Sequence, residues 1–108
     1  MNYNIIATPK FKKEIKRLAK KFHSLKNEYA ALIEKLQENR AYGTPIGNGC
    51  YKIRLAIASK NKGKSGGAGV ITYALIENNT VFLITIYDKS EQEDISDKEL
   101  ATLLKEIK

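Results

Sequence analysis

The stretch that decides the fold runs from Cys50 to Tyr73 and reads CYKIRLAIASKNKGKSGGAGVITY. Its first part alternates apolar residues with basic or small ones, which is the period of a half-buried β-strand. This alternation places Lys52 and Arg54 on the same face of the strand. A connection rich in glycine and lysine follows, and a second strand begins near Gly69. We therefore expect a basic sheet face beside a basic loop, a combination suited to an anionic ligand.

The charge of the whole chain supports this expectation. The 108 residues carry a formal net charge of +7, and the pI is about 9.5. Such a balance favours a polyanionic partner, nucleic acid first, although lysines can also serve solubility alone. In residues 88–108 the acidic side chains outnumber the basic ones. An acidic end on a basic body indicates either a docking face or an internal counter-charge.

Composition and length bound the class of protein. A hydrophobic fraction of 43% and a charged fraction of 29% are ordinary for a globular chain, and the length fits one domain spanning residues 1–108. The first ten residues lack the apolar core of a signal peptide. The longest apolar run, Val81–Ile86, is too short to cross a bilayer. The lone Cys50 cannot form an internal disulfide, so we expect a cytoplasmic protein without a membrane partner.

The segment before this stretch predicts a strand and two helices. Tyr3–Ala7 is a short apolar run, and Thr8 followed by Pro9 is typical of a helix start. Ser24 is expected to cap a second helix that ends near Arg40. Because each helix has an apolar stripe and the join is short, we expect an antiparallel helical hairpin.

Two connections are predicted from their turn residues. Residues 41–49 are rich in glycine and are expected to form a loop. Asn78-Asn79 separates two β-rich runs and predicts a two-residue hairpin turn. That turn would place Gly69 opposite Asp88, and Ala68 opposite Lys89.

The last helix is predicted to begin at Ser96, because Glu99 completes a capping-box pattern three residues later. The expected order of elements is β-α-α-β-β-β-α. This order predicts an α+β domain in which the helical hairpin and the C-terminal helix pack on a small, largely antiparallel sheet.

Several kinds of active site are disfavoured by the residues present. Gly63-Lys64-Ser65 resembles the end of a phosphate-binding P-loop, but Ala58 stands where the first glycine is needed and a strand follows instead of a helix. A chain with one histidine, placed between two helices, lacks the base that serine and cysteine hydrolases need. A metal nuclease would need the acidic residues after the last strand, and such clusters more often cap helices or stay solvated: Asp88, Glu91, Glu93 and Asp94.

Lysine, arginine and tyrosine remain, and these residues can cleave RNA without a metal or cofactor. The RNA supplies its own nucleophile, the 2′-hydroxyl group. Cations stabilise the negative charge of the phosphorane-like transition state, and a tyrosine, a lysine or water moves the protons.

Three segments carry a resemblance to a known family. They read YKIRL at 51–55, GKSGGA at 63–68 and YDKSE at 87–91. Together with the order of elements, they strongly resemble the RelE/ParE superfamily of toxins from bacterial toxin–antitoxin pairs, in particular the RelE/HigB branch with its lysine-rich loop KGKSGGAR. The resemblance spans the chain from Tyr3 to the last helix. It implies a RelE-like fold and a ribosome-dependent endoribonuclease, an mRNA interferase that inhibits translation. It also implies neutralisation by an antitoxin, with operator DNA reached only through the antitoxin complex.

The resemblance also implies site residues. Lys52 and Arg54 match the family's basic pair, Lys89 matches a basic residue after the last strand, and Tyr87 is a nearby candidate for proton transfer. The loop residues Lys60, Lys62 and Lys64 are expected to bind RNA.

At Gly69 this chain departs from the family, which typically has an arginine there to hold the scissile phosphate. The departure predicts an attenuated or inactive toxin that still folds and binds its antitoxin, unless Lys64 or Lys89 substitutes for the arginine. It also predicts that Gly69→Arg raises cleavage. Two alternatives stay open: a ParE-like inhibitor of DNA gyrase, and an inactive protein that only binds antitoxin and regulates the operator.

Overall fold

The computed structural model describes residues 3–60 and 67–107, without the side chains of Lys60 and Ile76. Among these residues, no helix has both the length and the apolar character needed to cross a membrane. The elements follow in this order: β1 (Asn4–Ala7), α1 (Pro9–Lys21), α2 (Leu25–Glu38), β2 (Thr44–Gly47), β3 (Cys50–Leu55), η1 (Ala58–Lys60), β4 (Ala68–Leu75), η3 (Ile76–Asn78), β5 (Thr80–Asp88) and α3 (Asp97–Ile107).

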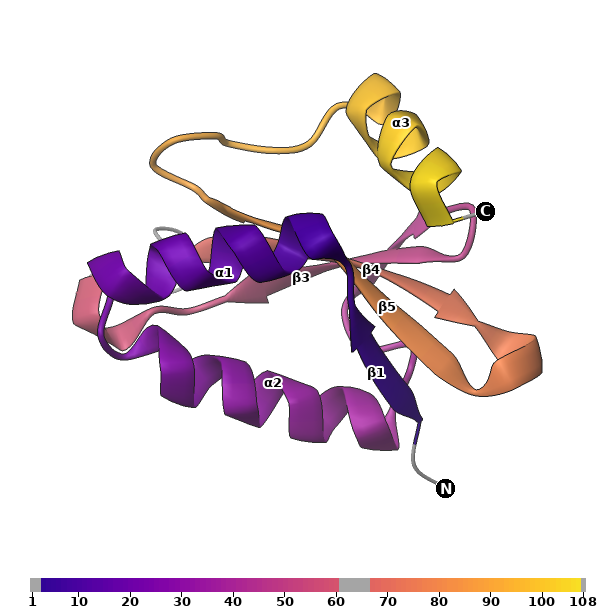
Figure 1. Cartoon of the computed structure of the whole chain (residues 1–108), viewed down its shortest axis with the longest axis horizontal. Helices are drawn as coiled ribbons and strands as arrows, with labels where there is room; N and C mark the ends of the chain where they lie inside the picture. The colour runs from indigo at the N-terminus through magenta and orange to yellow at the C-terminus, as the bar shows by residue number, and fades with distance from the viewer. Residues whose placement is uncertain (1–2, 61–66, 108) are drawn as a thin grey trace.

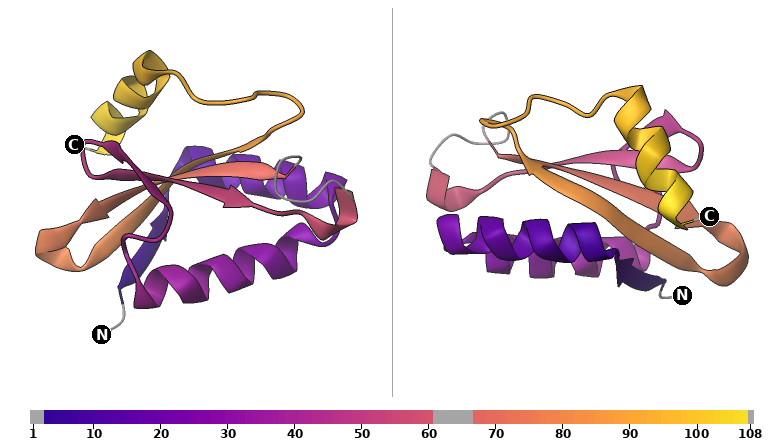
Figure 2. Two further views of the ribbon diagram at one scale, coloured as in Figure 1. Left: turned by 180° about the vertical axis from the view of Figure 1, so that it is seen from behind. Right: turned by 45° about the horizontal axis from the view of Figure 1, so that its top comes forward.

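The five strands form one mixed sheet in the order β1-β5-β4-β3-β2. Strand β1 runs parallel to β5, and the other neighbouring pairs are antiparallel. The hairpin of α1 and α2 covers one face of the sheet, and α3 lies on the other face (Figures 1 and 2). The α+β class and the largely antiparallel sheet that the sequence predicts are therefore confirmed.

The face beneath α1 and α2 holds the larger apolar cluster. Phe11, Leu18 and Leu36 are fully buried there, because their spacing keeps them on the helix sides that face the sheet. From the sheet they meet Ile53 and Leu83. The alternation along β3 thus sends Ile53 into this core and leaves Lys52 and Arg54 for the opposite face.

The face beneath α3 holds a smaller cluster. Leu100, Leu103 and Leu104 of α3 pack there against Cys50 and Ile71. The helix begins as predicted, since the backbone N–H of Glu99 donates to Ser96 Oγ at 3.1 Å. Tyr87 lies at one margin of this cluster, which brings the apolar face of α3 next to the basic end of the sheet.

Both helix caps predicted in the hairpin lie at the predicted residues, and one of them forms its side-chain hydrogen bond. Thr8 Oγ1 accepts the N–H of Phe11 at 3.2 Å. The same hydroxyl donates to the carbonyl oxygens of Leu83 and Ile84, both at 3.0 Å, and so ties the start of α1 to β5. Ser24 is the N-cap residue of α2, at the predicted position, but its side chain accepts no hydrogen bond from the backbone of that helix.

The loop predicted for residues 41–49 contains strand β2, which the sequence reading missed. Thr44–Gly47 pairs with β3 at the edge of the sheet. The turn between them consists of Asn48 and Gly49, whose φ angles are 57° and 77°. Positive φ at both positions is what a two-residue hairpin turn requires, and Asn-Gly is the sequence that favours it. The signal was present, hidden among the neighbouring glycines.

The two-residue turn predicted at Asn78-Asn79 is also wrong. Leu75 pairs with Thr80, so the connection spans residues 76–79 and includes the short helix η3. Asn79 closes it with a φ of 49°. A longer connection shifts the register of the whole β4–β5 pair relative to the expected one.

A β-bulge then reverses part of that shift. Ile84 of β5 has no opposite residue in the register between Ile71 and Thr72 of β4. An extra residue on one strand moves all later pairs by one position. The predicted partners are therefore wrong by one residue: Gly69 lies opposite Tyr87 rather than Asp88, and Ala68 lies opposite Asp88 rather than Lys89.

Candidate active site

Four predicted catalytic residues belong to β3, to β5 or to the residue directly after β5, at one end of the sheet. Arg54, Gly69 and Tyr87 lie directly opposite one another across β3, β4 and β5. Lys52 lies two residues before Arg54 on the same face, and Lys89 follows β5, where its backbone N–H donates to Gly67 O at 3.1 Å. This corrected register places Tyr87, rather than Asp88, beside the centre of the strand trio. The roles of Lys52, Arg54, Tyr87 and Lys89 remain predictions.

Lys52 and Tyr87 share an acidic partner that the sequence does not predict, since Asp94 was expected to cap a helix, to stay solvated or to bind a metal. Lys52 Nζ donates to Asp94 Oδ1 at 2.8 Å, and the hydroxyl of Tyr87 donates to the same oxygen at 3.3 Å. The backbone N–H of Ile95 donates to it as well, at 2.8 Å. Asp94 lies in the connection between β5 and α3, so only tertiary folding brings it to β3.

These contacts set the protonation of the group. The hydrogen bond from Lys52 is the main cause that holds the pKa of Asp94 below its usual value. Burial, reinforced by the negative charge of Asp94, raises the pKa of Tyr87 to about 12. Tyr87 is only 5% exposed. At neutral pH it is therefore a protonated hydrogen-bond donor and not a phenolate base.

The ring of Tyr87 occupies the space beside Gly69. A Cβ atom at Gly69 would lie far inside van der Waals contact with the ring carbons and the hydroxyl of Tyr87. Glycine leaves room here for the aromatic side chain of the facing strand, which covers its backbone. Any larger residue at this position, including the arginine of Gly69→Arg, therefore requires the ring of Tyr87 to shift.

Two other acids, at the end of β5 and just after it, form ion pairs with α1. Arg17 Nη2 lies 2.8 Å from Glu91 Oε1, and Lys21 Nζ lies 3.4 Å from Asp88 Oδ2. Asp88 is fully buried and also accepts from the backbone N–H and the hydroxyl of Ser90. Within residues 3–60 and 67–107, no group of three or more potential ligands is placed to hold a metal ion. The acidic segment is thus an internal counter-charge.

Hydrogen bonds hold the turn that precedes the basic loop. Lys62 and Lys64 lie outside the described residues, as does the side chain of Lys60. At the preceding turn, the backbone N–H groups of Ala58 and Ser59 donate to Glu28 Oε2 at 2.6 Å and to Ser24 Oγ at 2.9 Å. No local pattern in the sequence predicts this contact, because it joins α2 to a segment 30 residues away.

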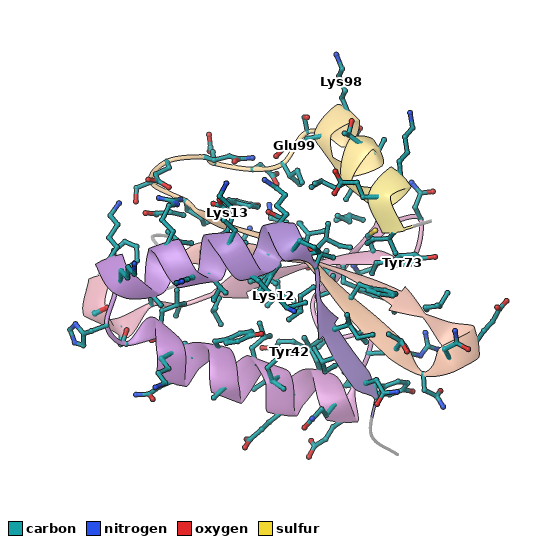
Figure 3. The ribbon with its side chains drawn as sticks, viewed as in Figure 1. Lys12, Lys13, Tyr42, Tyr73, Lys98 and Glu99 are labelled. Carbon is teal, nitrogen blue, oxygen red and sulfur yellow. The ribbon has the colours of Figure 1, made fainter. Side chains whose placement is uncertain are left out.

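Other lysines lie away from this end of the sheet. Lys98 extends from α3 away from the rest of the molecule, and Lys12 and Lys13 lie on α1 (Figure 3). Lys98 is exposed and forms no ion pair with any residue that the structure describes. It offers a matched control for substitutions of Lys52.

Solved structures share this fold at low sequence identity. The chain is similar to a mutant of the E. coli toxin RelE in the free state, with a TM-score of 0.66, 17% identity and 100% coverage of both chains. It is similar to the isolated E. coli RelE toxin, with a TM-score of 0.57 and 22% identity over 98% of this chain and 99% of that one. A metal-bound toxin from Helicobacter pylori gives a TM-score of 0.50 at 20% identity, over 85% of this chain and 99% of that one.

The sequence itself decides the family. Residues 10–108 match the family described as the RelE toxin of the RelE/RelB toxin–antitoxin system. The match includes both helices of the hairpin, the four strands β2–β5 and α3. Membership implies an antitoxin partner. The chain therefore belongs to the RelE toxin family and is the toxin component of a toxin–antitoxin pair.

Proposed function

We propose that this toxin is an endoribonuclease that cleaves messenger RNA on the ribosome, in the cytoplasm, without a metal or cofactor. The observation that carries the proposal is the placement of Lys52, Arg54 and Tyr87 on neighbouring strands at one end of the sheet, with Lys89 directly after β5. Three cations and a protonated tyrosine are the groups that a reaction using the RNA 2′-hydroxyl needs. The loop lysines 60, 62 and 64 would hold neighbouring phosphates.

In the proposed reaction, the 2′-oxygen attacks the adjacent phosphorus and the bond from phosphorus to the 5′-oxygen breaks. The products are a 2′,3′-cyclic phosphate and a 5′-hydroxyl end. Lys52 and Arg54 stabilise the negative charge that grows on the non-bridging oxygens. Tyr87 is suited to protonate the leaving 5′-oxygen, because its raised pKa keeps the hydroxyl proton in place at neutral pH. Water or a lysine takes the proton of the 2′-hydroxyl.

Because glycine and not arginine stands at position 69, we expect RNA cleavage by this toxin to be slow. An arginine at this position would give a forked contact with the phosphate, and glycine gives none. Tyr87 fills the space and contributes a neutral donor instead of a charge. Losing one preorganised donor costs on the order of 10²–10³ in rate in other enzymes. We therefore expect an attenuated toxin, and an inactive antitoxin-binding protein is the second candidate that Gly69 favours.

The test is induced expression without the antitoxin, followed by mapping of mRNA 5′ ends. We expect growth arrest with new 5′ ends inside translated codons. Lys52→Ala and Arg54→Ala should each lower cleavage of ribosome-bound message by about 10²–10³. The control Lys98→Ala removes the same charge from α3 and should leave cleavage unchanged.

Three outcomes contradict the proposal in different ways. Growth arrest with intact mRNA and blocked supercoiling would assign a gyrase inhibitor. No arrest, with normal antitoxin binding, would assign the inactive regulatory protein. Equal loss in Lys52→Ala and Lys98→Ala would show that overall charge, and not the placement of Lys52 with Arg54 and Tyr87, drives the effect.

A further inference from the structure

We propose that Asp94 occupies, while RNA is absent, the subsite in which Lys52 and Tyr87 would hold a phosphate oxygen of the substrate, and that RNA must displace it. The inference rests on the proposed function, since it names where the substrate phosphate binds. It adds that, in the isolated toxin, the carboxylate of Asp94 competes with RNA for this subsite.

The geometry around Asp94 Oδ1 is that of an anion site. Lys52 Nζ, the hydroxyl of Tyr87 and the N–H of Ile95 donate to it at 2.8, 3.3 and 2.8 Å. Two of these donors belong to residues of β3 and β5, so the sheet fixes the backbone from which both side chains extend, whether or not Asp94 is present. A charged donor and a neutral donor that converge on one oxygen suit a non-bridging phosphate oxygen as well as a carboxylate.

The side chain of Lys52 is more buried than that of its partner Asp94. The side chain of Lys52 is 19% exposed, whereas that of Asp94 is 59% exposed. The cation is thus fixed by its surroundings, and the acid reaches it from solvent at the end of an irregular segment. Leaving Lys52 costs Asp94 little, because an exposed carboxylate is readily hydrated.

A phosphate and Asp94 cannot both occupy this point, because two negative groups within hydrogen-bond distance of one ammonium repel each other strongly. Binding of RNA therefore requires Asp94 to move away. The ion pairs that join this segment to α1 do not oppose the movement, because they do not involve Asp94. They link Glu91 to Arg17 and Asp88 to Lys21.

The test compares two substitutions that remove the same charge one residue apart. Asp94→Asn removes the proposed competitor, and Glu93→Gln is the control. Glu93 is exposed and forms no ion pair within the described residues. The probe is a 2′-O-methylated RNA hexanucleotide, which carries phosphates but no 2′-hydroxyl to react. Its affinity for the isolated protein is measured by fluorescence anisotropy at low salt.

We expect Asp94→Asn to bind the probe roughly fivefold more tightly than Glu93→Gln does. Asp94→Glu, which keeps the charge, should not bind more tightly than the unmodified protein. Equal affinity of the Asn and Gln variants would overturn the subsite, because the effect would then be one of net charge. Failure of all these proteins to bind the probe would overturn it as well.

The unmodified protein gives a second measurement that does not depend on folding of a variant. When Asp94 leaves, the N–H of Ile95 loses its acceptor, so the probe should speed hydrogen exchange at that amide. An unchanged or slower exchange would contradict displacement. These readouts do not use cleavage: if they succeed while ribosome-bound message stays intact, the subsite stands and the proposed nuclease activity fails.

Discussion

The two faces of the sheet use the same strands for different purposes. The face under α1 and α2 is covered by two long helices and buries an almost wholly apolar cluster. The face under α3 is covered by one shorter helix over part of its length. Lys52, Arg54 and Tyr87 lie on this face, and among the described residues the segment that carries Asp94 contacts Lys52 and Tyr87 there. A half-covered face leaves polar side chains of the strands within reach of a ligand.

The comparison shows how stability and a binding site coexist in a small chain. Along β3, Ile53 points to the first face, and its neighbours Lys52 and Arg54 point to the second. The apolar face fixes the strand, and the strand in turn fixes the spacing of the two cations. If this division holds, substitutions on the first face should change stability and those on the second should change binding.

The largest expected effect is on the first face. Phe11 is fully buried, and Phe11→Ala should lower the free energy of unfolding by about 3–5 kcal/mol. Leu103 on α3 is 8% exposed, and Leu103→Ala should cost about 2 kcal/mol, near the lower end for such truncations. Urea denaturation of both variants measures the difference. A larger loss for Leu103→Ala would mean that α3, and not the hairpin, carries the core.

Next in size is the packing of Gly69 under Tyr87. Gly69→Arg should lower the free energy of unfolding by about 1–3 kcal/mol, because the new side chain displaces a buried ring. Replacing Tyr87 by glycine as well makes room, so the double variant should be more stable than the sum of the two single losses predicts. Denaturation of all four proteins in the double-mutant cycle gives this coupling.

The same four proteins also test the role of position 69 in cleavage. The double variant and Tyr87→Gly both lack the proposed proton donor. Cleavage on ribosomes should therefore be higher in the double variant, where the guanidinium has space beside Arg54, than in Tyr87→Gly, and should not rise in Gly69→Arg alone. Additive stability losses would contradict the contact between Gly69 and Tyr87. A rise in cleavage from Gly69→Arg alone would show that the ring moves aside without cost.

The sequence predicts the first face better than the second. Apolar spacing in the hairpin identifies the buried residues, and period-2 alternation in β3 identifies which side chains oppose them, since both follow from local geometry. Strand β2 was missed although Asn48-Gly49 marks its turn. The register of β4 on β5 was wrong because a bulge at Ile84 and the length of a connection are not local signals.

Within the site, the cations were identified from their pattern, and their acidic partner was not. Lys52 and Arg54 stand on a strand whose faces can be read from sequence. Asp94 reaches Lys52 from an irregular segment 42 residues away, as the numbering of the pair shows. No periodicity links the two positions, so only the folded structure reveals the contact and the space that Tyr87 takes from Gly69.

The smallest expected effect concerns two tyrosines, one on each face. Burial alone raises the pKa of Tyr29 under the hairpin, whereas burial and Asp94 together raise the pKa of Tyr87 to about 12. A tyrosine whose pKa is higher in the folded than in the unfolded state stabilises the fold below its unfolded pKa near 10. As the pH rises from about 10 to about 12, the unfolded state loses the proton first, and stability falls.

Comparison of the unmodified protein with Tyr87→Phe isolates this contribution, since the lysines and the other tyrosines titrate in both. Between pH 10 and pH 12 the unmodified protein should lose on the order of 1 kcal/mol more than Tyr87→Phe does. Asp94→Asn should lower the pKa of Tyr87, measured by NMR titration, and leave that of Tyr29 unchanged, because no acid contributes to the shift on the hairpin face. An equal change in the pKa of both tyrosines would mean that Asp94 acts through the stability of the whole fold. The two faces of the sheet would then not be electrostatically independent.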